Sequence, residues 1–456
     1  MITECEPIDS ESDCSACELC DSSDNESESS RRRVPADAPH AESSRRVVEA
    51  VPPVSLDAES QQKWQFTVDA CSKSAPGRVD IDNIDKDVSA AIDWMASNSP
   101  QDIIKFREDA ISDIEFRQHE LWESGEATEW LMSADPHARV IAQDVNGPLI
   151  EELAAASGFW DPECIDMFRF GAPVVGKLPL SGSGPPCAVT EPVPVEDLRE
   201  KCGERNRALL STLREDPHAD FLMSQIKKDA ALGRITEPVS ITQVDLDKVV
   251  LARRFSVEQG TKADGSPKLR AVDDESANGT NSCCAQTEKP ACDSMDAFVR
   301  SIVRFSRKTG VAPAFWKADI DAAYRRIPVM PEHRWLLWIV ILIGGDLFAA
   351  MHTALCFGCI GSVLGWNRIG ALIAHVARVV LKLPVNRYVD DLFGVDWPQC
   401  TVHAMQCFAR LVRAMLGFTA IAAAKLNAGA PLDVLGLMIS ASPSSVFVQL
   451  TREKAV

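Results

Sequence analysis

Two adjacent aspartates, Asp390 and Asp391, interrupt an otherwise apolar stretch, and this pair constrains the fold more than any other feature of the sequence. The flanking residues 385–395 are rich in valine, leucine and phenylalanine, which predicts two short strands. Adjacent carboxylates repel one another, and a divalent cation or full solvation relieves that repulsion. We therefore expect a tight hairpin that presents both carboxylates to a cation, with a solvated turn as the alternative.

A second acidic segment, residues 317–329, begins at the end of another predicted strand and carries Asp319. Mg²⁺ prefers oxygen ligands and commonly takes one or two carboxylates together with substrate phosphates. Asp319, Asp390 and Asp391 on neighbouring strands could hold two such ions about 4 Å apart. That arrangement activates an attacking hydroxyl and stabilises a leaving pyrophosphate, whereas a helix cap is the alternative role for Asp319.

From residue 249 onwards, short apolar runs alternate with turns, and the order of elements predicts the fold class. The order from residue 316 is strand, hairpin, helix, hairpin, helix and strands, which suits an α+β fold. We expect an antiparallel sheet with helices on one face. The predicted strands lie at 249–257, 268–274, 316–320, 335–343, 347–355, 385–395, 418–424 and 434–439, and the predicted helices at 361–383 and 400–416.

Residues 1–200 differ in composition from the rest and identify no chemistry. They hold 16 Lys and Arg against 41 Asp and Glu, whereas residues 201–456 hold 31 against 25. The C-terminal part is therefore mildly basic and could approach phosphates, although the whole chain has a net charge of −19. We expect a disordered acidic tail at 1–60, a helical region with a linker at 61–195, and helices at 195–213 and 219–232.

The cysteines and the apolar runs of the sequence bear on the cellular compartment and on metal binding. The 15 cysteines are odd in number and irregularly spaced, which is typical of reduced intracellular thiols. Cys5, Cys14, Cys17 and Cys20 could bind a metal or be solvated thiols. The longest apolar run, 335–343, is too short to span a bilayer, and the polar N-terminus is no signal peptide. We expect an intracellular protein, nuclear or cytoplasmic, that is neither secreted nor membrane-bound.

Residues 250–440 resemble the fingers and palm of reverse transcriptases, with the motifs in the family's order. Residues 388–391 (Tyr-Val-Asp-Asp) match the YxDD box. Asp319 matches the first metal-binding aspartate and precedes an aromatic residue, Tyr324, by five positions. Further matches are the glycine–serine motif at 356–362, Lys425 with the later Leu435 and Gly436, and the fingers elements Lys268, Arg270, Asp273, Asp274 and Asn278.

The resemblance implies a role for each matching residue. Asp319, Asp390 and Asp391 would hold two Mg²⁺ ions, or Mn²⁺, with the backbone carbonyl of Ile320 as a further ligand. Asp321 matches a family position that is not a metal ligand. Tyr324 would exclude a ribose 2′-OH, or it is a core aromatic. We also expect Lys268 and Arg270 to contact the triphosphate and Lys425 to contact the pyrophosphate. Gly358 and Ser362 would contact the template, and Tyr388 the substrate. The alternatives for these residues are surface or structural roles.

The sequence also departs from many retroviral enzymes, because Cys356 and Phe357 precede the motif's glycine where those enzymes have Pro-Gln. The Phe-Gly variant resembles retrotransposons, especially DIRS-like elements. We divide the resembling part into a fingers-like region (196–315), a palm-like region (316–445) and the start of a thumb (446–456). Only 17 residues follow Ile439, so we expect a fragment of a longer polyprotein or a decayed gene copy, with thumb, RNase H and recombinase domains encoded elsewhere.

Three functions compete at this point. The first is RNA-directed DNA polymerase activity of a retroelement, acting on an RNA template, a DNA primer and dNTPs. The second is an inactive or domesticated fragment that binds nucleic acid or protein. The third is an RNA-dependent RNA polymerase, against which Tyr324 and Val389 argue because both match the DNA-synthesising family.

Overall fold

The structure, a computed structural model, describes residues 83–261 and 265–450. The predicted acidic tail, its four cysteines and the last six residues lie outside the described residues. Within the described part, no helix combines the length and the apolar character needed to cross a bilayer.

Residues 86–170 are helical, as the periodicity predicts. Ser99 accepts a hydrogen bond from the amide of Asp102 and caps the longest of these helices, which has Pro100 at its first position. The helices are α2 (Lys86–Ala96), α3 (Pro100–Glu123), α4 (Glu126–Met132), α5 (Pro136–Ile141), α6 (Gly147–Ser157) and α7 (Met167–Phe170), with the 3₁₀ turn η1 (Pro162–Asp166) before α7.

The carboxylate-bearing sheet has four antiparallel strands in the order β11 (Leu426–Gly429), β6 (Ala314–Asp319), β10 (Asp391–Asp396) and β9 (Val385–Tyr388). Helices α11 (Ile360–Val380) and α12 (Thr401–Leu416) cover one face of this sheet. On that face the ring of Trp316 packs against Phe408 of α12, with ring centroids 5.1 Å apart.

The opposite face of the sheet is only partly open. Helix α10 (Met295–Thr309) covers its far end, where Phe298 packs edge-on against Phe315 and Phe393. The prediction of helices on one face is therefore wrong. Alternation along β6 explains the difference, because Phe315 and Trp316 point to opposite faces and each needs a covering helix.

A second sheet of five strands has the order β2 (Val239–Ser240), β8 (Asp346–Met351), β7 (Trp338–Ile343), β3 (Leu251–Thr261) and β4 (Pro267–Asp273). All pairs are antiparallel except β3 with β7. Gly344 and Gly345, at φ of 59° and 87°, form the turn between β7 and β8, a conformation that favours glycine. The predicted helices before this sheet are α8 (Val195–Thr212) and α9 (Ala219–Ala231).

The remaining strands show where local sequence misled the prediction. Residues 418–424 form two 3₁₀ turns, η6 (Phe418–Ala420) and η7 (Ala423–Lys425), so the predicted strand there is wrong. The region expected as a linker contains buried Ala172, Val174 and Leu178. The small sheets are β1 (Gly176–Lys177) with β5 (Cys284–Ala285), and β12 (Leu432–Val434), β13 (Leu437–Ser442) and β14 (Ser445–Leu450).

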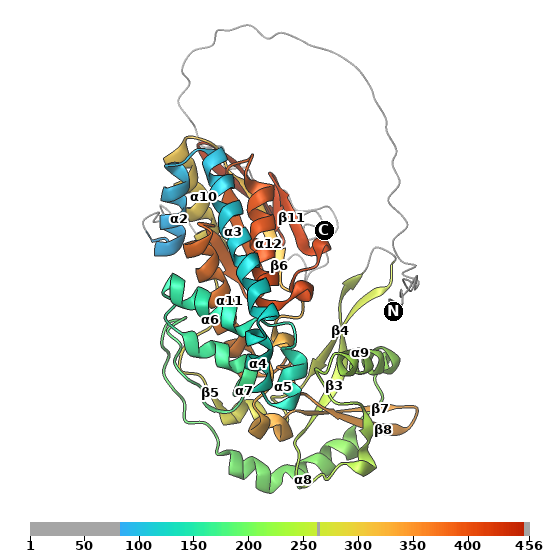
Figure 1. Ribbon diagram of the computed structural model, residues 1–456. Coiled ribbons are helices and arrows are strands. Elements are labelled where there is room, and N and C mark those ends of the chain that lie inside the picture. Colours follow the sequence, from blue (N-terminus) through green and yellow to red (C-terminus); the bar gives the residue numbers. More distant parts are fainter. Residues whose placement is uncertain (1–82, 262–264, 451–456) are drawn as a thin grey trace, which may run out of the picture. The chain divides into compact units, whose positions relative to one another are not determined.

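The N-terminal helices share their core with the carboxylate-bearing sheet. Figure 1 shows α3 running alongside α12, and the two helices pack against each other. Arg107 of α3 is fully buried and contacts Asp396 of β10 at 2.5 Å. Its guanidinium also donates to the carbonyls of Leu381 and Lys382. Residues 86–170 are thus part of the same folded unit as the sheet.

Candidate active site

The hairpin between β9 and β10 holds its two aspartates through a strained residue. Val389 has φ of 55°, in the left-handed region that a β-branched side chain rarely adopts. Its carbonyl accepts a hydrogen bond from Trp366 Nε1 at 2.9 Å, and the carbonyl of Asp390 accepts one from the amide of Ile320 at 3.2 Å. These two bonds fix the hairpin tip against α11 and the end of β6.

Strand register places two of the three predicted metal ligands opposite each other, and the third, Asp390, is next to one of them in the chain. Asp391 is paired directly with Asp319 across β10 and β6. Burial, then repulsion from Asp390 and Asp319, raises the pKa of Asp391 to about 6. Burial, followed by repulsion from Asp319, also raises the pKa of Asp390. The site therefore concentrates more negative charge than its surroundings neutralise.

Lys425 is the cation that meets this cluster. Leu426 is paired with Ala318, so the preceding Lys425 lies beside the end of β6. Its Nζ contacts Asp319 Oδ2 at 2.5 Å, and this bond raises the pKa of Lys425. Lys317 and Arg270 also lower the pKa values of Asp391 and Asp390, respectively, but burial and repulsion between the carboxylates outweigh these cations.

The donor set fits hard divalent cations. The carboxylates supply oxygen ligands, which Mg²⁺ and Mn²⁺ prefer. The raised pKa values of Asp390 and Asp391 are the sign of an acidic cluster that a cation would stabilise. Asp319, Asp390 and Asp391 are the residues that would hold the ions.

An aromatic pair adjoins the carboxylates. Tyr324 is 9% exposed, and its ring packs edge-on against Phe357 with centroids 5.1 Å apart. Burial and then the neighbouring Asp390 raise the pKa of Tyr324 to about 12, so its hydroxyl stays protonated. The guanidinium of Arg270 lies over the Phe357 ring at 5.5 Å. Phe357 thus joins the predicted sugar-contacting residue to a predicted triphosphate-contacting residue.

A cationic cavity of about 590 Å³ opens beside this pair. Lys268 and Arg270, both exposed on β4, line it together with Asp321 and Phe357. Arg326, 8% exposed, also lines it; its guanidinium donates only to the carbonyl of Asp321 and to Thr419. Its charge has no described carboxylate partner, so the cavity favours an anionic ligand.

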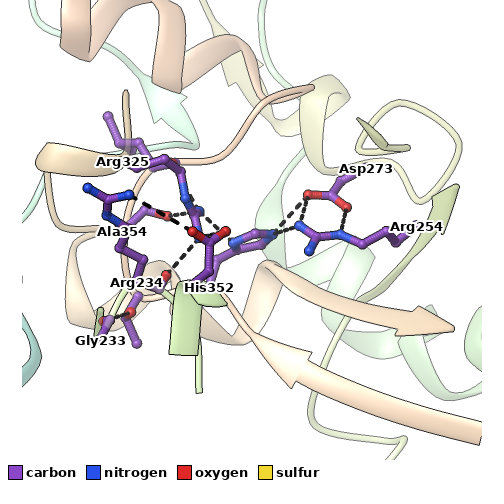
Figure 2. Close-up of polar contacts among 10 residues, drawn as sticks. Gly233, Arg234, Arg254, Asp273, Arg325, His352 and Ala354 are labelled. Carbon is purple, nitrogen blue, oxygen red and sulfur yellow. Dashed lines mark hydrogen bonds and ion pairs between the residues drawn. The ribbon is translucent and has the colours of Figure 1, made fainter. Parts of the chain in front are cut away.

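The wall of the cavity is a buried charge network, shown in Figure 2. Asp273 accepts two hydrogen bonds from Arg254, at 2.7 and 2.9 Å, and lies 2.9 Å from His352 Nε2. The other ring nitrogen, Nδ1, lies 2.8 Å from Arg325. Burial and then Arg325 lower the pKa of His352 to about 4, so the ring is neutral: Nδ1 accepts from Arg325, and Nε2 donates to Asp273.

The loop before α11 approaches this network closely. Gly358 has φ of 94°, and a Cβ there would lie 2.3 Å from the carbonyl oxygen of Asp273, so only glycine fits. Asn281 ties the loop down, because its side chain donates to the carbonyl of Gly358 and accepts from the amide of Ile360. Ser362 is 1% exposed, so its side chain is not placed to contact a template strand.

A groove of about 560 Å³ adjoins Asp391. Tyr388, 46% exposed, lines it together with Lys317, Asp391 and Asp433. Tyr388 and Asp391 therefore share one hollow, whereas Lys268 and Arg270 line another.

The predicted site residues thus separate into three groups. Asp319 is paired with Asp391 and contacts Lys425, Tyr324 lies near Asp390, and Lys268 and Arg270 line the adjacent cavity. Asp273 and Asn278 are structural: Asp273 is a buried counter-ion, and Asn278 donates to Glu275 at 2.8 Å. Sequence analysis missed the role of Phe357, although its position before Gly358 was a usable signal. It also missed the roles of four residues that no sequence pattern marks: Arg254, Arg325, His352 and Asn281.

Comparisons with known proteins add a weak likeness of fold. No protein-family model and no curated protein matches the sequence. Among solved structures, the chain is similar to the foamy viral protease-reverse transcriptase dRH bound to double-stranded DNA, at 14% identity and a TM-score of 0.38, over 59% of this chain and 49% of that chain. The same viral protein with an RNA/DNA hybrid gives a TM-score of 0.34 at 14% identity, over 59% and 38% of the two chains.

The native protease-reverse transcriptase of prototype foamy virus gives 16% identity and a TM-score of 0.30, over 52% of this chain and 33% of that chain. The chain therefore spans half or less of the length of these solved chains. A likeness of this size carries no argument about activity, for which the geometry of the site is the basis.

Proposed function

We propose that the chain is an RNA-directed DNA polymerase of a retroelement, which transfers a nucleotidyl group from a dNTP to a primer 3′-OH. The observation that carries the proposal is the pairing of Asp391 with Asp319, beside Asp390, next to a cationic cavity. In this proposal, the β3–β4 hairpin acts as fingers and the four-stranded sheet as the palm.

The residues divide the work of nucleotidyl transfer by position. Two bound Mg²⁺ ions would activate the primer hydroxyl and stabilise the departing pyrophosphate. Asp319, Asp390 and Asp391 would hold the ions. Lys268 and Arg270 orient the triphosphate from the cavity through charge-assisted hydrogen bonds. Catalysis is then mainly positioning and charge neutralisation.

Lys425 and Tyr324 complete the proposed assignment. Lys425 already contacts Asp319, so it can place positive charge where pyrophosphate develops negative charge. Tyr324 lies beside Asp390 with its ring fixed by Phe357, which suits a rigid barrier to a ribose 2′-OH. We expect replacement of Tyr324 by alanine to increase rNTP incorporation relative to dNTP incorporation, at least about tenfold.

Primer extension by the full chain on poly(rA)·oligo(dT), with Mg²⁺ and dTTP, tests the proposal. We expect extension by the wild-type chain and a loss of at least about a hundredfold in the Asp390→Asn/Asp391→Asn variant. Asp346→Asn is the matched control, because Asp346 is exposed at the start of β8 and lines neither the cationic cavity nor the carboxylate site, and it should retain activity.

Two outcomes would overturn the proposal. Extension that persists in the double variant would remove the carboxylates from the mechanism. A folded wild-type chain that binds the primer–template without extending it would point to the alternative, a fragment that acts as a nucleic-acid binding module.

A further inference from the structure

A second group of metal-ligating side chains lies away from the carboxylate site, where α3 crosses α12. Glu108 of α3 and His403 and Cys407 of α12 bring one donor atom each to within 4.8 Å of one another. His403 and Cys407 are four residues apart, so they share one face of α12. The group therefore joins the N-terminal helices to a helix that covers the sheet.

The distances between these donors come close to those around a tetrahedral zinc ion. Zinc bonds of about 2.0 to 2.3 Å place neighbouring ligand atoms roughly 3.3 to 3.7 Å apart. Glu108 Oε2 lies 3.1 Å from His403 Nε2, and Cys407 Sγ lies 3.6 Å from the same nitrogen. The sulfur is also 3.7 Å from Nδ1, so the ring must turn about its Cβ–Cγ bond to direct one nitrogen at a shared ion.

Burial is graded across the three residues in a way that suits an ion with one open position. Cys407 is fully buried, the side chain of His403 is 19% exposed, and that of Glu108 is 47% exposed. A metal held by these three ligands keeps its fourth position toward solvent, where water completes the coordination.

Local charge can accommodate a divalent ion. Arg410 contacts Glu108 at 2.8 and 3.0 Å, but it also contacts Glu115 at 2.8 and 2.6 Å. If Glu108 turns to a metal, Arg410 keeps Glu115 as its partner. With carboxylate, thiolate and neutral imidazole as ligands, the charges of the site sum to zero around a divalent cation.

We propose that Glu108, His403 and Cys407 form a zinc site that fastens α3 to α12. The mixed oxygen, nitrogen and sulfur donors suit Zn²⁺ and are unsuited to Mg²⁺. On binding, the Cys407 thiol releases its proton to solvent as the zinc–sulfur bond forms, and the imidazole exchanges its hydrogen bond with Glu108 for the metal. This site is independent of the proposed polymerase function, because none of its residues lines the carboxylate site.

Cobalt titration of the full chain tests the proposal, because a Co²⁺–thiolate bond absorbs in the near ultraviolet whereas carboxylate-bound Co²⁺ does not. Cys5, Cys14, Cys17 and Cys20 are first replaced by serine, which removes the candidate thiol ligands near the N-terminus, whereas a band from Cys356, which lies with Asp273 and His352, would persist in Cys407→Ser. We expect a thiolate–cobalt band that saturates at one equivalent, is abolished by added Zn²⁺, and is lost in Cys407→Ser. Cys400→Ser, which changes a buried thiol at the start of the same helix, should retain the band.

Two variants at partly exposed residues, His403 and Arg410, keep the test decisive if Cys407→Ser does not fold. His403→Ala should weaken Zn²⁺ binding at least about tenfold, measured by competition with a chromophoric chelator. Arg410→Met should tighten it, because Glu108 loses its competing cation. Zn²⁺ should raise the unfolding midpoint of the wild-type chain and not that of His403→Ala. Absence of the band in the wild-type chain, or binding unchanged by His403→Ala, would overturn the proposal.

Discussion

Strand β10 carries an aspartate at each end, and the two carboxylates have different partners, although burial raises the pKa of both. Asp396 is fully buried and contacts Arg107 at 2.5 Å. Asp391 lies near two other carboxylates, and burial together with their repulsion raises its pKa to about 6. One end therefore pairs its carboxylate with an arginine, whereas the other holds carboxylates that repel one another.

In our proposal, the Asp391 end gives up stability for metal binding. Helix α3 supplies the cation at the Asp396 end, and it comes from the part of the chain in which sequence analysis found no function. Lys425 and, in our proposal, metal ions supply the positive charge at the Asp391 end. The helices of residues 86–170 therefore support the sheet that carries the site, although none of them contributes a residue to the site.

The largest expected effect on stability follows from deleting the helices of residues 86–170. A fragment of residues 201–456 loses α3, leaves Asp396 buried without its partner and exposes the face of α12. We expect no cooperative thermal transition by circular dichroism, whereas a fragment of residues 83–456 should keep one. A cooperative transition in the shorter fragment would show that the helices are dispensable.

A point change at the buried end should have a smaller effect of the same sign. Arg107→Met leaves the carboxylate of Asp396 buried without its ion pair, which costs about 3–5 kcal/mol in the free energy of unfolding. Urea denaturation measures the loss. Arg117→Met on the same helix is the control, since its partner Glu152 is exposed, and it should change the free energy of unfolding far less.

A change at the Asp391 end of β10 should increase the free energy of unfolding instead of lowering it. Asp390→Asn/Asp391→Asn removes two partly buried charges and the repulsion between them, so without divalent ions the variant should be more stable than the wild type by about 1 kcal/mol. Mg²⁺ should stabilise the wild type more than the variant in thermal unfolding. A variant that is less stable in chelator would contradict the assignment of the carboxylates as a repulsive cluster.

The smallest effect is a pH dependence. Because the pKa of Asp391 is raised to about 6 in the folded state from 3.8, its protonated form favours folding. In chelator, the contribution of this group to stability should be present at about pH 4 and lost as the pH rises through about 6. The double variant should lack this decline, and parallel curves for the two proteins would argue against it.

Sequence predicts the parts of this site that depend on neighbouring residues. The hairpin at 385–395 was predictable because its two strands and its turn are contiguous. The meeting of Asp319 with Lys425 depends on the pairing of β6 with β11, and the meeting of Arg107 with Asp396 spans 289 positions, so no local pattern reveals them.

The failed strand at 418–424 has a physical cause. Its apolar residues favour a strand locally, but the carbonyl of Ile421 accepts hydrogen bonds from Arg413, and that of Ala420 accepts one from the amide of Asp321. These tertiary bonds hold the segment in short turns between α12 and β11. Local propensity was overridden by partners that lie elsewhere in the fold.

The most direct test of the central claim is anomalous diffraction from Mn²⁺ in crystals of the full chain with a primer–template and a non-hydrolysable dNTP analogue. We predict two peaks about 4 Å apart, bound by Asp319, Asp390 and Asp391, with the analogue's phosphates reaching toward Lys268 and Arg270. A ternary complex without manganese at these carboxylates would contradict the account.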